Sequence, residues 1–277
     1  MIQTTIKRLG RPIVSSVAFL TGYCFLTESL GVNRGARILS YHGINHRPTN
    51  SYAVPTQKYA NQMKFLTERF TIISVDQLVD LLREGKSIPP RAVTIDDGYK
   101  DAYTNAYPIL KRFAIPATIF LPVEFIGASP SERATSKLPQ TDFLSWDQVR
   151  EMSQNGIAFG SHTLTHVSLT KLTLQEVQYQ LESSKARLEI EIGKPVPGFS
   201  YPYGTVRDFN PEIEQLVAAA GYSWAVTGLS GVNNRRSNLF ALRRTKVERD
   251  DGMYVFKKAM RGALDPWIVM DRLGKFL

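Results

Sequence analysis

Short apolar stretches alternate with amphipathic helical stretches along most of this 277-residue chain, and this alternation restricts the fold more than any other feature. The apolar stretches suit buried strands, and strand and helix together recur in units of about 30 residues. Strands joined through a helix run parallel, so we expect an α/β fold with a parallel sheet closed, or nearly closed, into a barrel. The expected strands are residues 36–41, 93–95, 117–121, 157–160, 197–201, 223–227 and 241–247.

Two adjacent carboxylates, Asp96 and Asp97, follow one of these strands directly and precede Gly98. The carboxyl ends of parallel strands are where α/β folds collect their chemistry. Adjacent acids repel each other and are costly to desolvate, so a compensating group is expected nearby. An Asp-Gly pair is also a common turn signal, so the doublet alone does not establish a site.

A pair of histidines four residues apart, His162 and His166, follows another expected strand. Two imidazoles and one carboxylate form a three-ligand set for a divalent metal, with open positions left for water and substrate. The second carboxylate is then free to act as a general base. A chance surface pair is the alternative, but both motifs follow apolar strands and should therefore meet on one face of the barrel.

The first 35 residues differ from the rest of the chain. Three cations between residues 7 and 11 precede an apolar stretch at 13–26, which is shorter than the ~20 residues that span a bilayer as a helix. The pattern resembles a signal peptide but lacks a clear cleavage site. Peripheral membrane contact through residues 1–30 is favoured over a helix packed on the catalytic domain. The expected units are an N-terminal segment, residues 1–35, and a catalytic domain, residues 36–277.

Composition narrows the class of protein without identifying it. An apolar content of 43% and a charged content of 21% are those of a globular protein. The formal net charge of +9 fits an anionic membrane face or an acidic glycan, whereas no basic motif interleaved with aromatic residues points to nucleic acid. The single Cys24 cannot form an internal disulfide.

Three motifs, at residues 94–98 (TIDDG), 161–166 (SHTLTH) and 199–204 (FSYPYG), give the chain a recognisable resemblance. They resemble, in the same order, the motifs of the polysaccharide deacetylases, also called the NodB-homology or carbohydrate esterase 4 family. The likeness covers roughly residues 36–250 and extends to the branch that acts on exopolysaccharide and poly-N-acetylglucosamine. It implies a distorted (β/α)7-type, TIM-like barrel.

The resemblance also implies a role for each motif residue. Asp97, His162 and His166 would ligate a divalent metal, most often Zn²⁺ in this family. Asp96 would be the general base that deprotonates a metal-bound water, which attacks the acetamide carbonyl of an N-acetylhexosamine. The backbone N–H of Tyr203 would stabilise the oxyanion.

The chain departs from the family pattern at two positions. The third motif usually begins with an arginine that holds the catalytic aspartate, and this chain has Ser200 there. Arg243 and Arg244 are the candidate replacements. The family's late histidine, the usual general acid, is missing, since no histidine follows His166. His42, after the first expected strand, is the candidate acid by analogy with the poly-N-acetylglucosamine branch.

The expected substrate is an N-acetylated polysaccharide or glycolipid of the bacterial cell envelope, bound at the membrane on a side that the sequence does not reveal. The oligomeric state is not predicted. Two alternatives stay open: a deacetylase of a lipid-linked sugar or other small molecule, and a catalytically inactive glycan-binding component of a polysaccharide assembly system. The residues expected to contact the sugar are Tyr99, Trp146, Pro202 and Tyr203.

Overall fold

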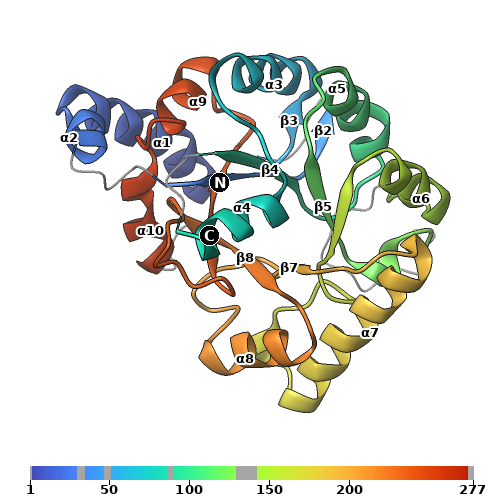
Figure 1. Cartoon of the computed structure of the whole chain (residues 1–277). Helices are drawn as coiled ribbons and strands as arrows, with labels where there is room; N and C mark the ends of the chain where they lie inside the picture. Colours follow the sequence, from blue (N-terminus) through green and yellow to red (C-terminus); the bar gives the residue numbers. More distant parts are fainter. Residues whose placement is uncertain (1, 30–34, 47–50, 86–89, 129–141, 274–277) are drawn as a thin grey trace.

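The computed structural model describes residues 2–29, 35–46, 51–85, 90–128 and 142–273. Seven parallel strands form a closed barrel in the order β1-β4-β5-β6-β7-β8-β9 (Figure 1). The barrel closes because β1 pairs with β4 on one side and with β9 on the other. The expected (β/α)7-type barrel is confirmed; its strands are β1 (Arg37–Tyr41), β4 (Arg91–Ile95), β5 (Ala117–Leu121), β6 (Ala158–Ser161), β7 (Gly198–Ser200), β8 (Trp224–Ser230) and β9 (Leu242–Lys246).

Helices surround the barrel, and a small two-stranded sheet of β2 (Ile44–Asn45) and β3 (Val54–Pro55) follows β1. The connection after β4 opens with a π-helix, η1 (Ala102–Ala106), before it continues as α5 (Tyr107–Arg112). The other helical elements are α3 (Thr56–Arg69), α4 (Val75–Arg83), η2 (Val123–Phe125), α6 (Trp146–Gln154), η4 (Leu169–Lys171), α7 (Leu174–Ile192), α8 (Pro211–Ala219), α9 (Met253–Ala259), η5 (Asp265–Trp267) and α10 (Ile268–Leu273).

Helix α4 lies across the end of the barrel at which the strands begin, and Figure 1 shows it within the ring of strands. Its apolar face, which includes Leu78 and Leu82, packs in one buried cluster with inward-facing strand residues such as Ile38 and Phe120. Ser74 caps the helix and forms a capping box with Gln77. Because α4 covers this end, the site chemistry belongs to the opposite end, where the strands terminate.

Two glycines inside the barrel make room for its largest aromatic side chains. A Cβ on Gly198 would lie 2.3 Å from the ring of Trp224, and one on Gly160 would lie 2.4 Å from the ring of Phe120. Phe120 and Trp224 in turn pack edge to face, with ring centroids 5.9 Å apart. The barrel interior is therefore a packed core rather than a channel.

The N-terminal segment forms α1 (Ile2–Leu20) and α2 (Tyr23–Ser29), and α1 packs against α9 beside the barrel. The side chain of Arg11 is 5% exposed and donates two hydrogen bonds to the carboxylate of Asp251, at 2.8 and 3.1 Å. A third bond, of 2.8 Å, reaches the carbonyl of Lys246 at the end of β9, and Glu248 lies 3.8 Å away. This segment includes a helix packed on the catalytic domain, and no described helix is long and apolar enough to cross a membrane.

Arg11→Met should lower the free energy of unfolding by about 3–5 kcal/mol, because it leaves two buried carboxylates without their cation. Urea unfolding followed by circular dichroism measures this change. Arg207→Met, at an exposed position, is the matched control and should change stability by about 0.5 kcal/mol or less. Equal effects of the two substitutions would show that the buried contacts of Arg11 do not stabilise the fold.

Candidate active site

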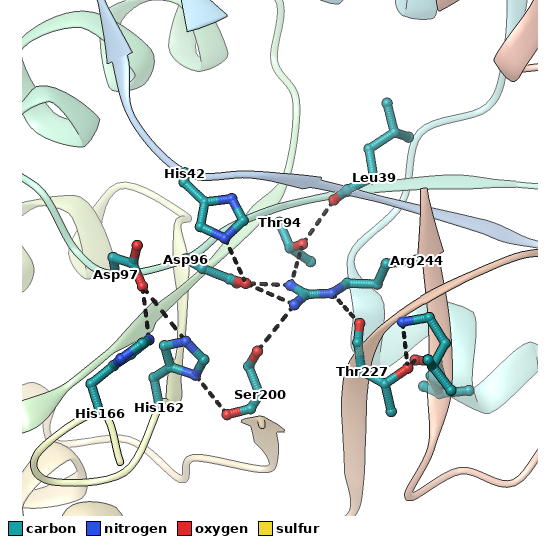
Figure 2. A network of polar contacts seen from close by, with 12 residues as sticks. Leu39, His42, Thr94, Asp96, Asp97, His162, His166, Ser200, Thr227 and Arg244 are labelled. Carbon is teal, nitrogen blue, oxygen red and sulfur yellow. Dashed lines mark hydrogen bonds and ion pairs between the residues drawn. The ribbon is translucent and has the colours of Figure 1, made fainter. Parts of the chain in front are cut away.

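Six of the residues singled out from the sequence meet where the strands end, and Figure 2 shows them: His42, Asp96, Asp97, His162, His166 and Arg244. Asp96 and Asp97 follow β4, His162 and His166 follow β6, and Arg244 comes from β9. The strands place these side chains together because β4, β5 and β6 are neighbours and β9 returns beside β1. Closure of the barrel therefore builds the site.

Asp97, His162 and His166 form a buried group whose candidate ligand atoms all lie within 4.8 Å of one another. Asp97 Oδ1 is 3.6 Å from Nε2 of His162 and 3.3 Å from Nε2 of His166, and it accepts no hydrogen bond in the described part of the chain. A tetrahedral ion with bonds of ~2.0–2.1 Å holds its ligand atoms about 3.3 Å apart. An orphaned carboxylate oxygen between two imidazole nitrogens thus fits a divalent cation.

The protonation state of His162 also suits a metal ligand. Its Nδ1 lies 2.6 Å from the carbonyl oxygen of Ser200, and because a carbonyl only accepts, Nδ1 carries the proton and Nε2 offers its lone pair toward Asp97. Burial, with a smaller contribution from His166, lowers the pKa of His162 to about 4. Burial would raise the pKa of Asp97, but three imidazoles, first that of His166 and then those of His42 and His162, outweigh it and hold this pKa well below its ordinary value. The group is therefore ready to bind a cation at neutral pH.

The loops of the site hold several residues in the left-handed backbone region. Asp97 (φ 75°), Thr163 (φ 66°), His166 (φ 54°) and Tyr203 (φ 61°) are four of the five non-glycine residues with positive φ in the described chain. Such conformations cost of order 1–3 kcal/mol each and persist where the surroundings enforce them. Because four of the five lie in the site loops, we infer that the surrounding structure holds the backbone of these loops in one conformation and so fixes the directions of their side chains.

Asp96 is bound by the guanidinium of Arg244 in a bidentate pair, with bonds of 2.8 and 2.7 Å to its two oxygens. Both side chains are buried, 2% and 3% exposed. Burial alone would raise the pKa of the Asp96 carboxyl, but the charge and hydrogen bonds of Arg244 lower it below its ordinary value. Asp96 is therefore ionised and oriented beside the candidate metal group.

Arg244 is itself fixed by groups from three other strands. Its Nε donates to the carbonyl of Thr227 at 2.7 Å, and its other nitrogens reach Thr94 and Ser200, each at 3.3 Å (Figure 2). Of the two candidate arginines, Arg243 does not contact Asp96. Because side chains alternate along a strand, Arg243 points away from the barrel interior, and the alkyl part of its side chain lies against Gly231. Ser200, at the position of the usual motif arginine, is one of the groups that hold Arg244.

His42 lies on the other side of Asp96, with its Nε2 3.8 Å from Asp96 Oδ2 and its side chain 23% exposed. Two residues that follow Asp97 in the sequence hold the loop that carries His42 by hydrogen bonds to its backbone. The carboxylate of Asp101 accepts the backbone N–H of Ile44 at 3.0 Å, and the amide of Asn105 donates to the Ile44 carbonyl at 2.7 Å. Burial raises the pKa of Asp101 to about 6.

The four residues expected to contact a sugar occupy different environments. Tyr203 is 46% exposed and its ring lies 5.0 Å from that of His166, whereas Pro202 beside it is buried. Tyr99 is buried against Phe143, and its pKa is raised by burial and by the charge of Asp97, so it packs behind this candidate ligand rather than facing solvent. The ring of Trp146 packs under Arg187 of α7, and no contact joins it to the three ligands among the described residues.

Several supporting residues were not anticipated from the sequence. Gln180 of α7 accepts the backbone N–H groups of Leu164 and Thr165, and so shapes the loop between the two histidines. Asp101 and Asn105 belong to the same category. Asp101 and Asn105 could have been found from the sequence, because both closely follow the acidic doublet. Gln180 could not, because it is a polar residue on a helix far from the motif in sequence.

Comparison with known proteins agrees with this geometry. The family model for polysaccharide deacetylase matches residues 84–225. The provisionally assigned polysaccharide deacetylase YxkH of Bacillus subtilis is 32% identical over 213 residues, which are 76% of this chain and 70% of that protein. The poly-beta-1,6-N-acetyl-D-glucosamine N-deacetylase of Staphylococcus aureus is 27% identical over 196 residues, 66% of this chain and 65% of that enzyme.

A solved structure shares the fold. The Streptococcus pyogenes deacetylase PplD, determined in complex with acetate, superposes with a TM-score of 0.71 and 22% identity, and the match covers 82% of this chain and 98% of that one. The match of the family model over half of the chain and the identity to YxkH show the family. The chain belongs to the polysaccharide deacetylases of carbohydrate esterase family 4, hydrolases that act on amide C–N bonds.

Proposed function

We propose that this chain is a metal-dependent N-deacetylase that hydrolyses acetamide groups of N-acetylhexosamine residues in an exopolysaccharide or related glycan of the bacterial cell envelope. The observation that carries the proposal is the buried Asp97–His162–His166 group directly beside Asp96, a carboxylate held ionised by Arg244. The name of the Staphylococcus aureus relative supports the choice of N-acetylglucosamine polymer as substrate.

A divalent ion held by the three ligands would acidify water and polarise a carbonyl oxygen. Zn²⁺ is our first choice for this ion, because two imidazoles and one carboxylate are a ligand set found in catalytic zinc sites. Asp96 accepts the proton of the attacking water. It can do so because its pKa is low enough to keep it ionised and because Arg244 fixes the direction of its oxygens.

Two further groups complete the proposed reaction. The backbone N–H of Tyr203 has no acceptor within the described chain, and the positive φ of this residue fixes its direction, so it can donate to the developing oxyanion. His42, whose Nε2 lies 3.8 Å from Asp96 Oδ2, donates a proton to the leaving amine. The exposed ring of Tyr203 beside His166 offers a face for the sugar.

The metal ligands are tested by metal content alone. Asp97→Ala and His166→Ala should each lose most of the bound divalent ion, because two protein ligands do not form a closed site, whereas Asp96→Asn should keep about one ion per chain. Inductively coupled plasma mass spectrometry of protein purified in the presence of Zn²⁺ measures this. Equal metal content in all three variants would remove these residues as the ligands.

The pairing of Asp96 with Arg244 predicts a change in the pH dependence of acetate release from N-acetylglucosamine oligomers. Arg244→Gln removes the charge that lowers the pKa of Asp96, so burial raises that pKa and the acidic limb of kcat/KM moves to higher pH. At neutral pH the loss should be about 10²-fold.

Arg243→Gln, one residue away and turned from the site, is the control and should keep the wild-type profile. Arg244→Lys keeps the charge but not the two parallel bonds, and should give an intermediate shift if the glutamine variant folds poorly. An unmoved acidic limb in both folded Arg244 variants would contradict the role of this pair.

The role of His42 is tested by comparing two leaving groups. His42→Gln should reduce acetate release from the oligomers by about 10²-fold, because an amine leaves only after protonation. Hydrolysis of 4-nitrophenyl acetate should fall much less, since nitrophenolate leaves without a proton. His46→Gln, at an exposed position, is the control. Equal losses for the amide and the ester would show that His42 does not protonate the leaving group.

A further inference from the structure

In the described part of helix α1, the polar side chains of Arg11 and Ser15 point inward, while three large apolar side chains point outward. Arg11, Ser15 and Ala18 are buried against the catalytic domain, whereas Ile13, Val17 and Leu20 are 59%, 54% and 81% exposed. The exposed residues are spaced by four and three positions, which places them on one stripe of the helix. A helix that only covers a globular core has the opposite arrangement, so this stripe needs a partner outside the barrel.

Two more large apolar side chains are exposed on the next helix, α2, where Phe25 and Leu26 are 72% and 57% exposed. We call these five residues, Ile13, Val17, Leu20, Phe25 and Leu26, the α1–α2 apolar face. Five of the thirteen exposed large hydrophobic side chains of the described chain thus fall within fourteen residues. Single exposed apolar residues need no explanation, but such a concentration marks an interaction surface.

The surface beside this face is basic. The segment from α9 to α10 lies next to α1 (Figure 1), and its exposed charged residues, among those described, are Lys257, Arg261 and Arg272. Of these, Lys257 lies over the ring of Phe65 on α3, 5.4 Å from its centroid, so Arg261 and Arg272 carry the charge argument. Its two acids are engaged elsewhere: Asp265 binds Arg37, and the buried Asp271 accepts the backbone N–H of Ser230. An apolar stripe flanked by cations suits a surface that is apolar inside and anionic outside.

We propose that the α1–α2 apolar face docks this protein on the surface of an anionic lipid bilayer, with α1 lying in the plane of the interface. A second copy of the chain fits less well, because a symmetric contact through this face would bring the flanking cations of the two copies together. Arg11 ties this face to the enzyme, because it binds the carbonyl of Lys246 at the end of β9 and the carboxylate of Asp251. The proposal concerns a different surface from the catalytic site and does not depend on the proposed reaction.

Co-sedimentation of the full chain with vesicles tests the proposal. We expect binding to vesicles of phosphatidylcholine with 30% phosphatidylglycerol, weaker binding to pure phosphatidylcholine, and a decrease of binding at high salt. Val17→Asp combined with Leu20→Asp should reduce the partition coefficient by about tenfold or more. Both side chains are exposed, so circular dichroism and the urea midpoint should stay unchanged.

The matched control is Leu174→Asp combined with Ile190→Asp, two exposed apolar positions on α7, across the barrel from α1 (Figure 1). This variant should bind the anionic vesicles as the wild type does. Absence of binding by the folded wild type, or equal loss in both double variants, would overturn the proposal. So would a wild-type dimer, seen by light scattering, that Val17→Asp with Leu20→Asp dissociates, since a second copy would then cover the face.

Discussion

The structure of this site depends on balancing two neighbouring buried carboxylates, Asp96 and Asp97. Both are almost inaccessible to solvent, so each must be compensated separately, and removal of either partner would leave an uncompensated buried charge. A guanidinium bound through two parallel hydrogen bonds balances Asp96, and two imidazoles with room for a cation balance Asp97. In the proposed reaction this division gives the two acids different roles: Asp96 is the base, and Asp97 is a metal ligand.

The closed barrel makes this balance possible. The side chain of Arg244 extends from β9 past the neighbouring β1 to the end of β4. It donates a hydrogen bond to the hydroxyl of Thr94 in β4, and this hydroxyl donates to the carbonyl of Leu39 in β1. An open sheet would separate β9 from β4 by its whole width. The positive φ values in the site loops are tolerated for the same reason, because strands on both sides and α7 behind fix the ends of these loops.

The sequence predicted the barrel and the residues that gather at its end, because strands of β-branched and aromatic residues are readable locally and parallel connections fix which strand ends share a face. It could not decide between Arg243 and Arg244, since that choice depends on which residue of a short strand faces inward. For the N-terminal segment it favoured peripheral membrane contact over a helix packed on the catalytic domain. The structure shows that α1 packs on the barrel through Arg11. In the sequence this residue is one of the three cations that precede the apolar stretch.

The two departures from the family pattern show that the site is defined by positions in space rather than by positions in the motifs. Ser200 stands where an arginine is usual, yet a guanidinium reaches Asp96 from another strand, and Ser200 binds it. No histidine follows His166, yet the imidazole of His42 lies beside Asp96 from the first strand, its loop held by Asp101. A barrel allows such exchanges because all its strands end at one rim, so a group lost from one loop can be supplied by another at the same point.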